Sequence, residues 1–213
     1  MKNKFYLRLF VVLVFLLPLA AILLMNWMDK AYSNLPILGP VIKENGKVQY
    51  HTIADFSLVN QRNEIVTIAD CDNKIVVADF FFTHCPSVCP KMTKNLQLVQ
   101  ANLKNHKIHI YSFSIDPERD TVERLKEYCE EMEIDNSNWD LLTGSKKEIY
   151  KLARNSFMLT ATDGDGGPDD FIHSENFVLI DKHRRIRGFY EGTNEKEVER
   201  LILDIKKLEN ENE

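Results

Sequence analysis

The chain has little basic charge outside its first residues. Its 27 lysines and arginines are outnumbered by 32 aspartates and glutamates, which gives a formal net charge of −5 at pH 7. Residues 1–28 carry three basic side chains and no acidic one, so the rest of the chain carries −8 (−5 minus +3). A surface with this excess of acid repels phosphate groups. The charge therefore argues against a nucleic acid as partner.

Other features that mark special protein classes are also absent. The 213 residues contain no internal repeat, and the hydrophobic fraction of 44% and the charged fraction of 28% are ordinary for globular proteins. These values argue against a disordered chain and against a membrane protein with several spans. The length fits one domain with a membrane anchor rather than two independent domains.

One long uncharged run stands at the start of the chain. Residues 9–25 contain no charged side chain, and residues 26–28 extend the run to about the 20 residues that cross a bilayer, with Trp27 at the interface. The basic residues that precede it are Lys2, Lys4 and Arg8. This pattern predicts a transmembrane helix within residues 1–28, with the cytoplasm on its N-terminal side and the following chain outside the cytoplasm.

A cleaved signal peptide is the alternative interpretation of this run. Its apolar part usually has about 7 to 15 residues and ends in small residues at the cleavage site, whereas Ala20 and Ala21 are followed by Ile-Leu-Leu-Met. No cysteine lies near the end of the run, which argues against a lipid-modified cysteine. We therefore expect a retained, single-pass anchor in the cell membrane.

The remaining chain divides into a linker and one domain. Residues 29–49 contain many turn-forming residues and no sustained apolar period, so we expect a juxtamembrane linker. Residues 50–213 should form the domain, which begins with a hairpin around residues 61–63. Residues 74–82 are almost continuously apolar and rich in β-branched and aromatic side chains. That pattern is typical of a central strand buried on both faces.

Helical and extended patterns alternate after this strand. The expected elements are, in order, a helix near residues 92–103, a strand over 108–115, a helix that opens at Asp120, strands at 177–180 and 186–190, and a helix over 195–208. A parallel β-α-β unit followed by an antiparallel hairpin and a helix is the thioredoxin-like plan. The sequence therefore predicts an α/β protein of thioredoxin-like fold, with a central mixed sheet flanked by helices.

Cys85 and Cys89 lie where the predicted central strand ends and the next helix begins. A helix N-terminus offers unpaired N–H groups and the positive end of the helix dipole. Both lower the pKa of a thiol and favour the thiolate that binds metals or attacks disulfides. Pro90 fits only near the start of a regular helix, so both cysteines should lie on the lead-in or the first turn.

Three chemical roles remain open for this pair. Its spacing departs from the redox Cys-x-x-Cys pattern, although nothing forbids a redox-active disulfide between Cys85 and Cys89 in an oxidising compartment. A purely structural disulfide would close a very short loop and stabilise little. A metal site needs a third ligand, for which His173, just before a predicted strand, is the best candidate. Two thiolates and one imidazole suit copper or zinc.

Three motifs, in one order along the chain, give a resemblance to a known family. They are Asp79-Phe-Phe-Phe-Thr-His-Cys-Pro-Ser-Val-Cys-Pro90, then Ser114-Ile-Asp-Pro-Glu-Arg-Asp-Thr121, and then Ile172-His-Ser174 ahead of Phe177-Val-Leu-Ile-Asp181. Over residues 50–192 the chain resembles the Sco/SenC family of copper chaperones. The resemblance implies a thioredoxin-like domain on one N-terminal anchor, with one copper ion bound by Cys85, Cys89 and His173.

The resemblance also implies a function and a partner. Copper would be delivered to, or used to mature, the copper centre of cytochrome c oxidase, whose copper-bearing subunit, or another copper protein, would be the partner. The alternative is a thiol-disulfide oxidoreductase that keeps the copper-site cysteines of a partner reduced, with Cys85 as the attacking thiolate. Many thioredoxin-like enzymes carry a proline where residues 172–176 read Ile-His-Ser-Glu-Asn. This departure favours a metal-binding protein over an enzyme.

The remaining candidates have lesser roles. Asp169 and Asp170 are potential hydrogen-bond partners of the His173 ring, since metal-binding imidazoles commonly donate their other N–H to a carboxylate. Cys71 is expected in a turn and Cys129 in a helix, and whether they pair is left open. None of the other histidines is expected to be a ligand.

Overall fold

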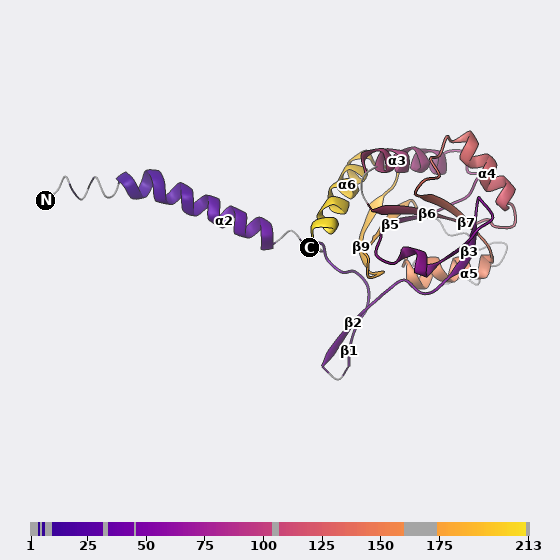
Figure 1. Cartoon of the computed structure of the whole chain (residues 1–213), viewed down its shortest axis with the longest axis horizontal. Helices are drawn as coiled ribbons and strands as arrows, with labels where there is room; N and C mark the ends of the chain where they lie inside the picture. The colour runs from indigo at the N-terminus through magenta and orange to yellow at the C-terminus, as the bar shows by residue number, and fades with distance from the viewer. Residues whose placement is uncertain are drawn as a thin grey trace.

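A seven-stranded mixed sheet is the central feature of the computed structural model of this protein (Figure 1). The structure describes residues 4, 6, 10–31, 34–44, 46–103, 107–159 and 174–211. The strands of the sheet are, in chain order, β3 (Ser57–Asn60), β4 (Ile65–Thr67), β5 (Ile75–Phe81), β6 (Ile108–Ser114), β7 (Trp139–Thr143), β8 (Asn176–Ile180) and β9 (Ile186–Glu191). Their order in space is β4-β3-β7-β6-β5-β8-β9.

The predicted order of elements is present around β5. β5 pairs in parallel with β6 and antiparallel with β8, which in turn pairs antiparallel with β9. Helix α3 (Val88–Asn102) connects β5 to β6, and α6 (Glu195–Asn210) follows β9. The α/β fold with a mixed sheet and flanking helices is therefore confirmed, and β3, β4 and β7 extend the sheet on the far side of β6.

Every residue of β5 is buried because helices and loops cover both faces of the sheet. The apolar odd-numbered residues of β5 belong to a core with α3, α6 and α4 (Val122–Glu131). Its apolar even-numbered residues belong to a second core with β3, with α5 (Lys146–Lys151) and with the π-helix η3 (Leu152–Ser156). Figure 1 shows α3 and α6 on one side of the sheet and α5 on the other. The strand was predicted to be buried on both faces, and this prediction is confirmed.

Helix α4 starts one residue later than the sequence pattern indicated. Its N-cap is Thr121, whose hydroxyl accepts a hydrogen bond from the N–H of Arg124 at 3.3 Å. Asp120, the expected first residue, is instead fully buried with its carboxylate turned to other partners. A capping side chain must be free to reach the helix N–H groups, and that of Asp120 is already engaged.

The segment before the domain contains regular structure and contacts the domain. Two short strands, β1 (Val41–Glu44) and β2 (Lys47–Tyr50), form a hairpin in which Gly46 has a φ of 75°. The N–H of Leu38 donates to the carbonyl of Ile186 at 2.8 Å. The stretch expected to be a linker thus contains a hairpin and pairs with the edge strand β9 at Leu38.

The N-terminal segment is helical and apolar. A π-helical turn η1 (Val12–Leu16) leads into α2 (Leu17–Ala31), and the side chains of residues 10–25 are exposed. In Figure 1, α2 lies apart from the sheet. Within the part of the chain that the structure describes, no helix is both long enough and apolar enough to cross a membrane.

Candidate functional site

The loop between β5 and α3 carries both predicted cysteines. β5 ends at Phe81 and α3 begins at Val88, so Cys85 lies on the lead-in and Cys89 on the first helical turn. The N–H of Cys85 donates to the carbonyl of Phe82 at 3.3 Å and closes a tight turn at the end of the strand. The helix starts where Pro90 requires it to start, because a proline further inside would clash with the preceding turn.

The two thiols lie together but in different surroundings. The N–H of Cys89 donates to the Sγ of Cys85 at 3.4 Å. Cys85 is half-buried, whereas Cys89 is only 5% exposed and packs in the core between α3 and the sheet. Both are free thiols in the structure. One sulfur is therefore accessible to a partner or a metal ion, and the other lies behind it.

These surroundings separate the acidities of the two thiols. Burial works to raise the pKa of Cys85, but backbone N–H groups of residues 87–89 and the Cys89 thiol hydrogen-bond to its sulfur and bring the pKa below its ordinary value. Burial raises the pKa of Cys89 to about 12, and the neighbouring sulfur of Cys85 and carboxylate of Asp79 act in the same direction. Cys85 is thus the thiol that ionises first.

A buried carboxylate belongs to the same side of the sheet as the cysteines. Asp79 is an odd-numbered residue of β5 and is 3% exposed. The hydroxyl of Ser112 donates to its Oδ1, and the indole N–H of Trp139 donates to Ser112 at 2.9 Å. Burial raises the pKa of Asp79 to about 7, although the Ser112 hydrogen bond opposes the rise. No sequence pattern identifies Asp79 as part of this arrangement, because Ser112 and Trp139 come from other strands.

The third predicted ligand, His173, lies outside the described residues, as do Asp169 and Asp170. Among the residues that are described, no three histidine, cysteine, aspartate or glutamate side chains form a group that could hold a metal ion. The pairing of β8 with β5 still bears on this ligand. Because the two strands are antiparallel, β8 begins at the edge of the sheet where β5 ends. The first residue of β8, Asn176, thus lies toward the end of β5 at which the cysteine loop starts.

The other two cysteines are on opposite faces of the sheet. Cys71 ends the 3₁₀ turn η2 (Ile68–Cys71) in the core that contains α5, and Cys129 lies on α4 in the core that contains α3. Burial raises the pKa of each thiol to about 12. The sheet separates them, so they cannot pair with each other.

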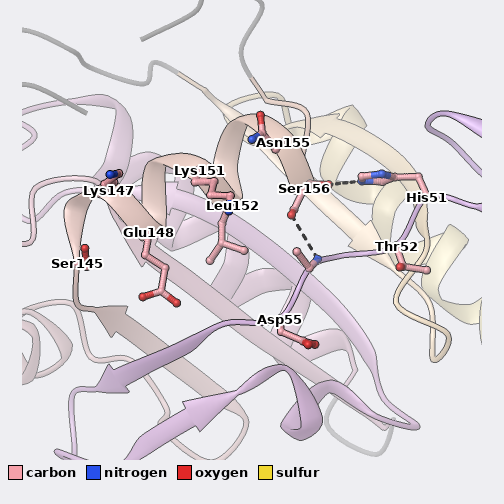
Figure 2. A pocket seen from close by; sticks show the side chains of 11 residues that line it. His51, Thr52, Asp55, Ser145, Lys147, Glu148, Lys151, Leu152, Asn155 and Ser156 are labelled. Carbon is pink, nitrogen blue, oxygen red and sulfur yellow. Dashed lines mark hydrogen bonds between the residues drawn. The ribbon is translucent and has the colours of Figure 1, made fainter. Parts of the chain in front are cut away.

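A cavity of about 560 Å³ lies on the face of the sheet that α5 covers (Figure 2). The Nε2 of His51 donates to the carbonyl of Ser156 at 2.8 Å, and the Ser156 hydroxyl accepts from the N–H of Ala54 at 3.3 Å. The residues that line the cavity are His51, Thr52, Ala54, Asp55, Ser145, Lys147, Glu148, Lys151, Leu152, Asn155 and Ser156. Neither Cys85 nor Cys89 is among them, so the cavity is separate from the dithiol.

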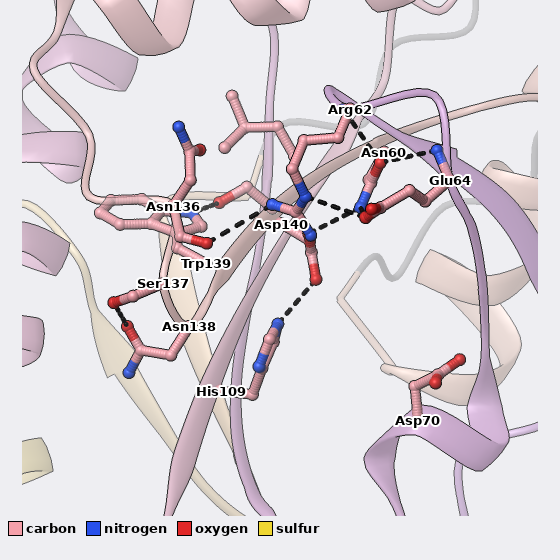
Figure 3. A network of polar contacts seen from close by, with 12 residues as sticks. Asn60, Arg62, Glu64, Asp70, His109, Asn136, Ser137, Asn138, Trp139 and Asp140 are labelled. Carbon is pink, nitrogen blue, oxygen red and sulfur yellow. Dashed lines mark hydrogen bonds and ion pairs between the residues drawn. The ribbon is translucent and has the colours of Figure 1, made fainter. Parts of the chain in front are cut away.

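A network of polar side chains joins β3, β6 and β7 (Figure 3). The buried Asp140 accepts from Arg62 at 2.6 Å, from His109 at 2.7 Å and from Asn60 at 2.9 Å. These donors satisfy the charge of a carboxylate that is inaccessible to water. His109 is therefore a hydrogen-bond partner of a buried carboxylate on the neighbouring strand.

The fold and the dithiol define the class of protein: a thioredoxin-like domain with two cysteines at the junction of its central strand and first helix. A model of the SCO1/SenC family matches residues 44–210. The SCO1 protein homolog of Bacillus subtilis is 32% identical over 159 residues, which cover 73% of this chain and 82% of that protein. The SCO2-like protein of Rickettsia felis is 30% identical over 151 residues, or 68% of this chain and 72% of that protein.

Solved structures agree with this assignment. BsSco, described as a member of the Sco family of cytochrome c oxidase assembly proteins with a disulfide switch, has a TM-score of 0.66 and 31% identity, covering 75% of this chain and 94% of that one. A SCO1/SenC family lipoprotein from Bacillus anthracis has a TM-score of 0.66 and 32% identity, covering 81% and 99%. Arabidopsis thaliana ScoI with copper bound has a TM-score of 0.58 and 26% identity, covering 72% and 97%. The chain belongs to the SCO1/SenC family, which confirms the resemblance drawn from its motifs.

Proposed function

We propose that this protein binds copper through Cys85, Cys89 and His173 and delivers it to the copper-bearing subunit of cytochrome c oxidase or to another copper protein. The observation that carries the proposal is the dithiol at the β5–α3 junction, in which one accessible sulfur is stabilised as a thiolate. Two comparisons add support, since Arabidopsis thaliana ScoI was solved with copper bound and BsSco is described as belonging to a family of cytochrome c oxidase assembly proteins.

The donor atoms fit copper. Thiolate sulfurs are soft ligands that favour Cu(I), and an imidazole suits copper in either oxidation state. The raised pKa of Cys89 means that its proton must leave when a metal binds. Metal binding to protonated ligands releases protons and weakens at low pH. We expect copper to be held at neutral pH and released more readily on acidification.

His173 is proposed as the third ligand because of the direction of β8. The register places Val178 opposite Ala78, so β8 begins toward the end of β5, where the cysteine loop starts. The antiparallel pairing also leaves only the short described stretch of residues 174–175 between His173 and the sheet.

The exposed apolar side chains at the N-terminus support a membrane location. Residues 10–25 present these side chains away from the domain, and exposed apolar surface of this extent calls for a membrane or a partner to cover it. We propose that residues 1–28 form a retained single-pass anchor, that residues 29–49 form a linker, and that residues 50–213 work outside the cytoplasm. Carbonate extraction of membranes and labelling of Cys85 with an impermeant maleimide in intact cells test this. Extraction of the full chain as a soluble protein, or labelling only after lysis, would contradict it.

Copper titration of the full-length protein in detergent tests the binding function. The wild type should bind about one copper ion per chain, and Cys85→Ser, Cys89→Ser and His173→Ala should each weaken binding. Cys129→Ser, on the same core but away from the loop, is the matched control and should bind as the wild type does. Equal binding by all four variants would contradict the proposal.

The opposite pKa shifts of the two thiols favour one second function, the reduction of a partner's disulfide. The Cys85 thiolate would attack one sulfur of the disulfide and release the other as a thiolate. Cys89, after losing its proton, would then attack Cys85 and release the second partner sulfur. The partner gains two electrons, and a Cys85–Cys89 disulfide forms. His173→Ala should leave this single turnover intact, whereas copper binding needs the histidine, so the variant separates the two functions.

A further inference from the structure

The buried carboxylate of Asp120 holds Thr83, near the start of the cysteine loop that runs from β5 to α3. Asp120 is fully buried in the connection between β6 and α4. Its Oδ1 accepts from the hydroxyl of Thr83 at 2.6 Å, and its Oδ2 accepts from the N–H of Thr83 at 3.2 Å and from the hydroxyl of Ser114 at 2.6 Å. Two of these three donors thus belong to Thr83, which lies two residues before Cys85.

The single proton of the Thr83 hydroxyl determines which nitrogen of the neighbouring His84 ring carries a proton. A threonine hydroxyl has one proton and two lone pairs, and here the proton is donated to Asp120. The hydroxyl oxygen must then accept from its two other neighbours, the Nε of Arg124 at 3.2 Å and the Nδ1 of His84 at 3.1 Å. The neutral His84 ring therefore carries its proton on Nδ1. The His84 side chain is half-exposed.

The same contacts determine the position of Cys85. The strand ends at Phe81, and the turn that follows is closed by the hydrogen bond from the N–H of Cys85 to Phe82. Within this turn, Thr83 is held by Asp120 and by Arg124 of α4, and Cys85 is held by the N–H of Cys89 of α3. The N–H groups of residues 87–89 can stabilise the Cys85 sulfur only if the turn keeps that sulfur in line with them.

We propose that Asp120 is a positioning residue that fixes the Thr83–Cys85 turn and, through Thr83, the orientation of the His84 ring. The proposal deepens the proposed function, because it rests on Cys85 as the reactive thiolate. It nevertheless concerns the protein without copper. A carboxylate is suited to this work because it accepts from all three donors at once, whereas a neutral amide accepts with only one of its two atoms.

The experiment is the rate at which iodoacetamide alkylates Cys85 in the reduced, copper-free, full-length protein at pH 7, measured by peptide mass spectrometry. Asp120→Ala should slow the reaction about fivefold, the effect expected from losing one hydrogen bond to the thiolate. Asp120→Asn should slow it less, because the amide oxygen can still accept from Thr83. In the wild type, the side-chain nitrogen shifts of His84 should report a proton on Nδ1, and Asp120→Ala should abolish this preference.

Asp140→Ala is the matched control, because Asp140 is another buried carboxylate with three hydrogen-bond donors but sits in a separate network. It should reduce stability without slowing Cys85. If Asp120→Ala fails to fold, Thr83→Val removes only the hydroxyl and should still slow the reaction. Equal rates for Asp120→Ala and Asp140→Ala, or a wild-type rate for Thr83→Val, would overturn the proposal. If Asp120→Ala slows alkylation but the wild type binds no copper, the role of Asp120 stands and the copper function is refuted.

Discussion

The backbone N–H of Cys89 hydrogen-bonds to the Sγ of Cys85 across 3.4 Å, while the thiol of Cys89 itself is buried. The second cysteine therefore stabilises the thiolate of the first through its main chain and remains protonated. A helix N-terminus produces this asymmetry, since its free N–H groups converge on a sulfur that precedes the helix. Cys85 is thus the accessible, reactive thiol of the pair, and Cys89 is a buried thiol that stays protonated until a reaction or a metal removes its proton.

This asymmetry predicts the order of chemical modification. In the reduced protein at pH 7, Cys85 should be alkylated at least about tenfold faster than Cys89, because its pKa is lowered and that of Cys89 is raised to about 12. Peptide mass spectrometry over a time course measures both rates. Cys71 and Cys129 serve as internal controls, since burial raises their pKa values to about 12 as well. Faster labelling of Cys89 than of Cys85 would refute the assignment.

Asp79→Asn should stabilise the protein at alkaline pH. The pKa of Asp79 is raised by burial to about 7, so the folded state binds a proton that the unfolded state has lost between about pH 4 and pH 7. The wild type should therefore lose stability as the pH rises through this window. The variant should be more stable than the wild type by about 2 to 4 kcal/mol at pH 8 and nearly equal to it at pH 4. Urea unfolding at the two pH values measures this, and an equal difference at both would count against it.

Asp140 should show the opposite pH dependence. Burial works to raise its pKa, but hydrogen bonds and charges from His109, Arg62 and Asn60 bring it below its ordinary value. Its contribution to stability is complete above the unfolded pKa and is lost as the pH falls through the lower, folded value. Asp140→Asn should therefore be less stable than the wild type at pH 6, by about 1 to 3 kcal/mol, and this gap should narrow by pH 3. Thermal unfolding across that range is the measurement, and a gap that widens on acidification would contradict it.

Arg187 should be essential for attaching the segment before the domain. Its guanidinium is 4% exposed and donates to the carbonyls of Leu35 and Pro36 while pairing with Asp181 and Glu211. Arg187→Ala removes one partner of a buried charged cluster, which costs about 3 to 5 kcal/mol. The variant should also be cleaved more quickly by proteases between residues 34 and 50.

The control for this prediction is Arg119→Ala, which removes a surface ion pair with Asp116 at 3.7 Å. Exposed pairs of this kind contribute about 0 to 1 kcal/mol. Denaturant unfolding should thus separate the two arginines clearly. Equal stability losses would show that the attachment of residues 35–36 depends on something other than Arg187.

The parts of the fold that could be predicted were those with a strong local pattern. β5 is recognisable because a strand covered on both faces is almost continuously apolar, here with Asp79 as the one polar residue. β7 and α5 were not predicted, because five and six residues are too few to establish a period. The β1–β2 hairpin is not predictable from the sequence either, because all eight of its strand residues are exposed, so that burial imposes no pattern of apolar and polar side chains on them.

The residues of the candidate site likewise fall into those that the sequence could predict and those that it could not. Cys85 and Cys89 could be identified because their placement depends only on a strand end and a helix start that are adjacent in the sequence. Asp79 and Asp120 could not, because their partners Ser112, Thr83 and Ser114 come from other segments and meet them only in the folded sheet. His173 stays a prediction from the motif and from the direction of β8.

The most direct test of the copper site is X-ray absorption at the copper edge of the loaded full-length protein. We predict two sulfur scatterers and one imidazole nitrogen in the wild type, loss of one sulfur in Cys85→Ser and in Cys89→Ser, and loss of the imidazole in His173→Ala. A wild-type spectrum without sulfur, or one that none of these three substitutions changes, would contradict copper binding at this site.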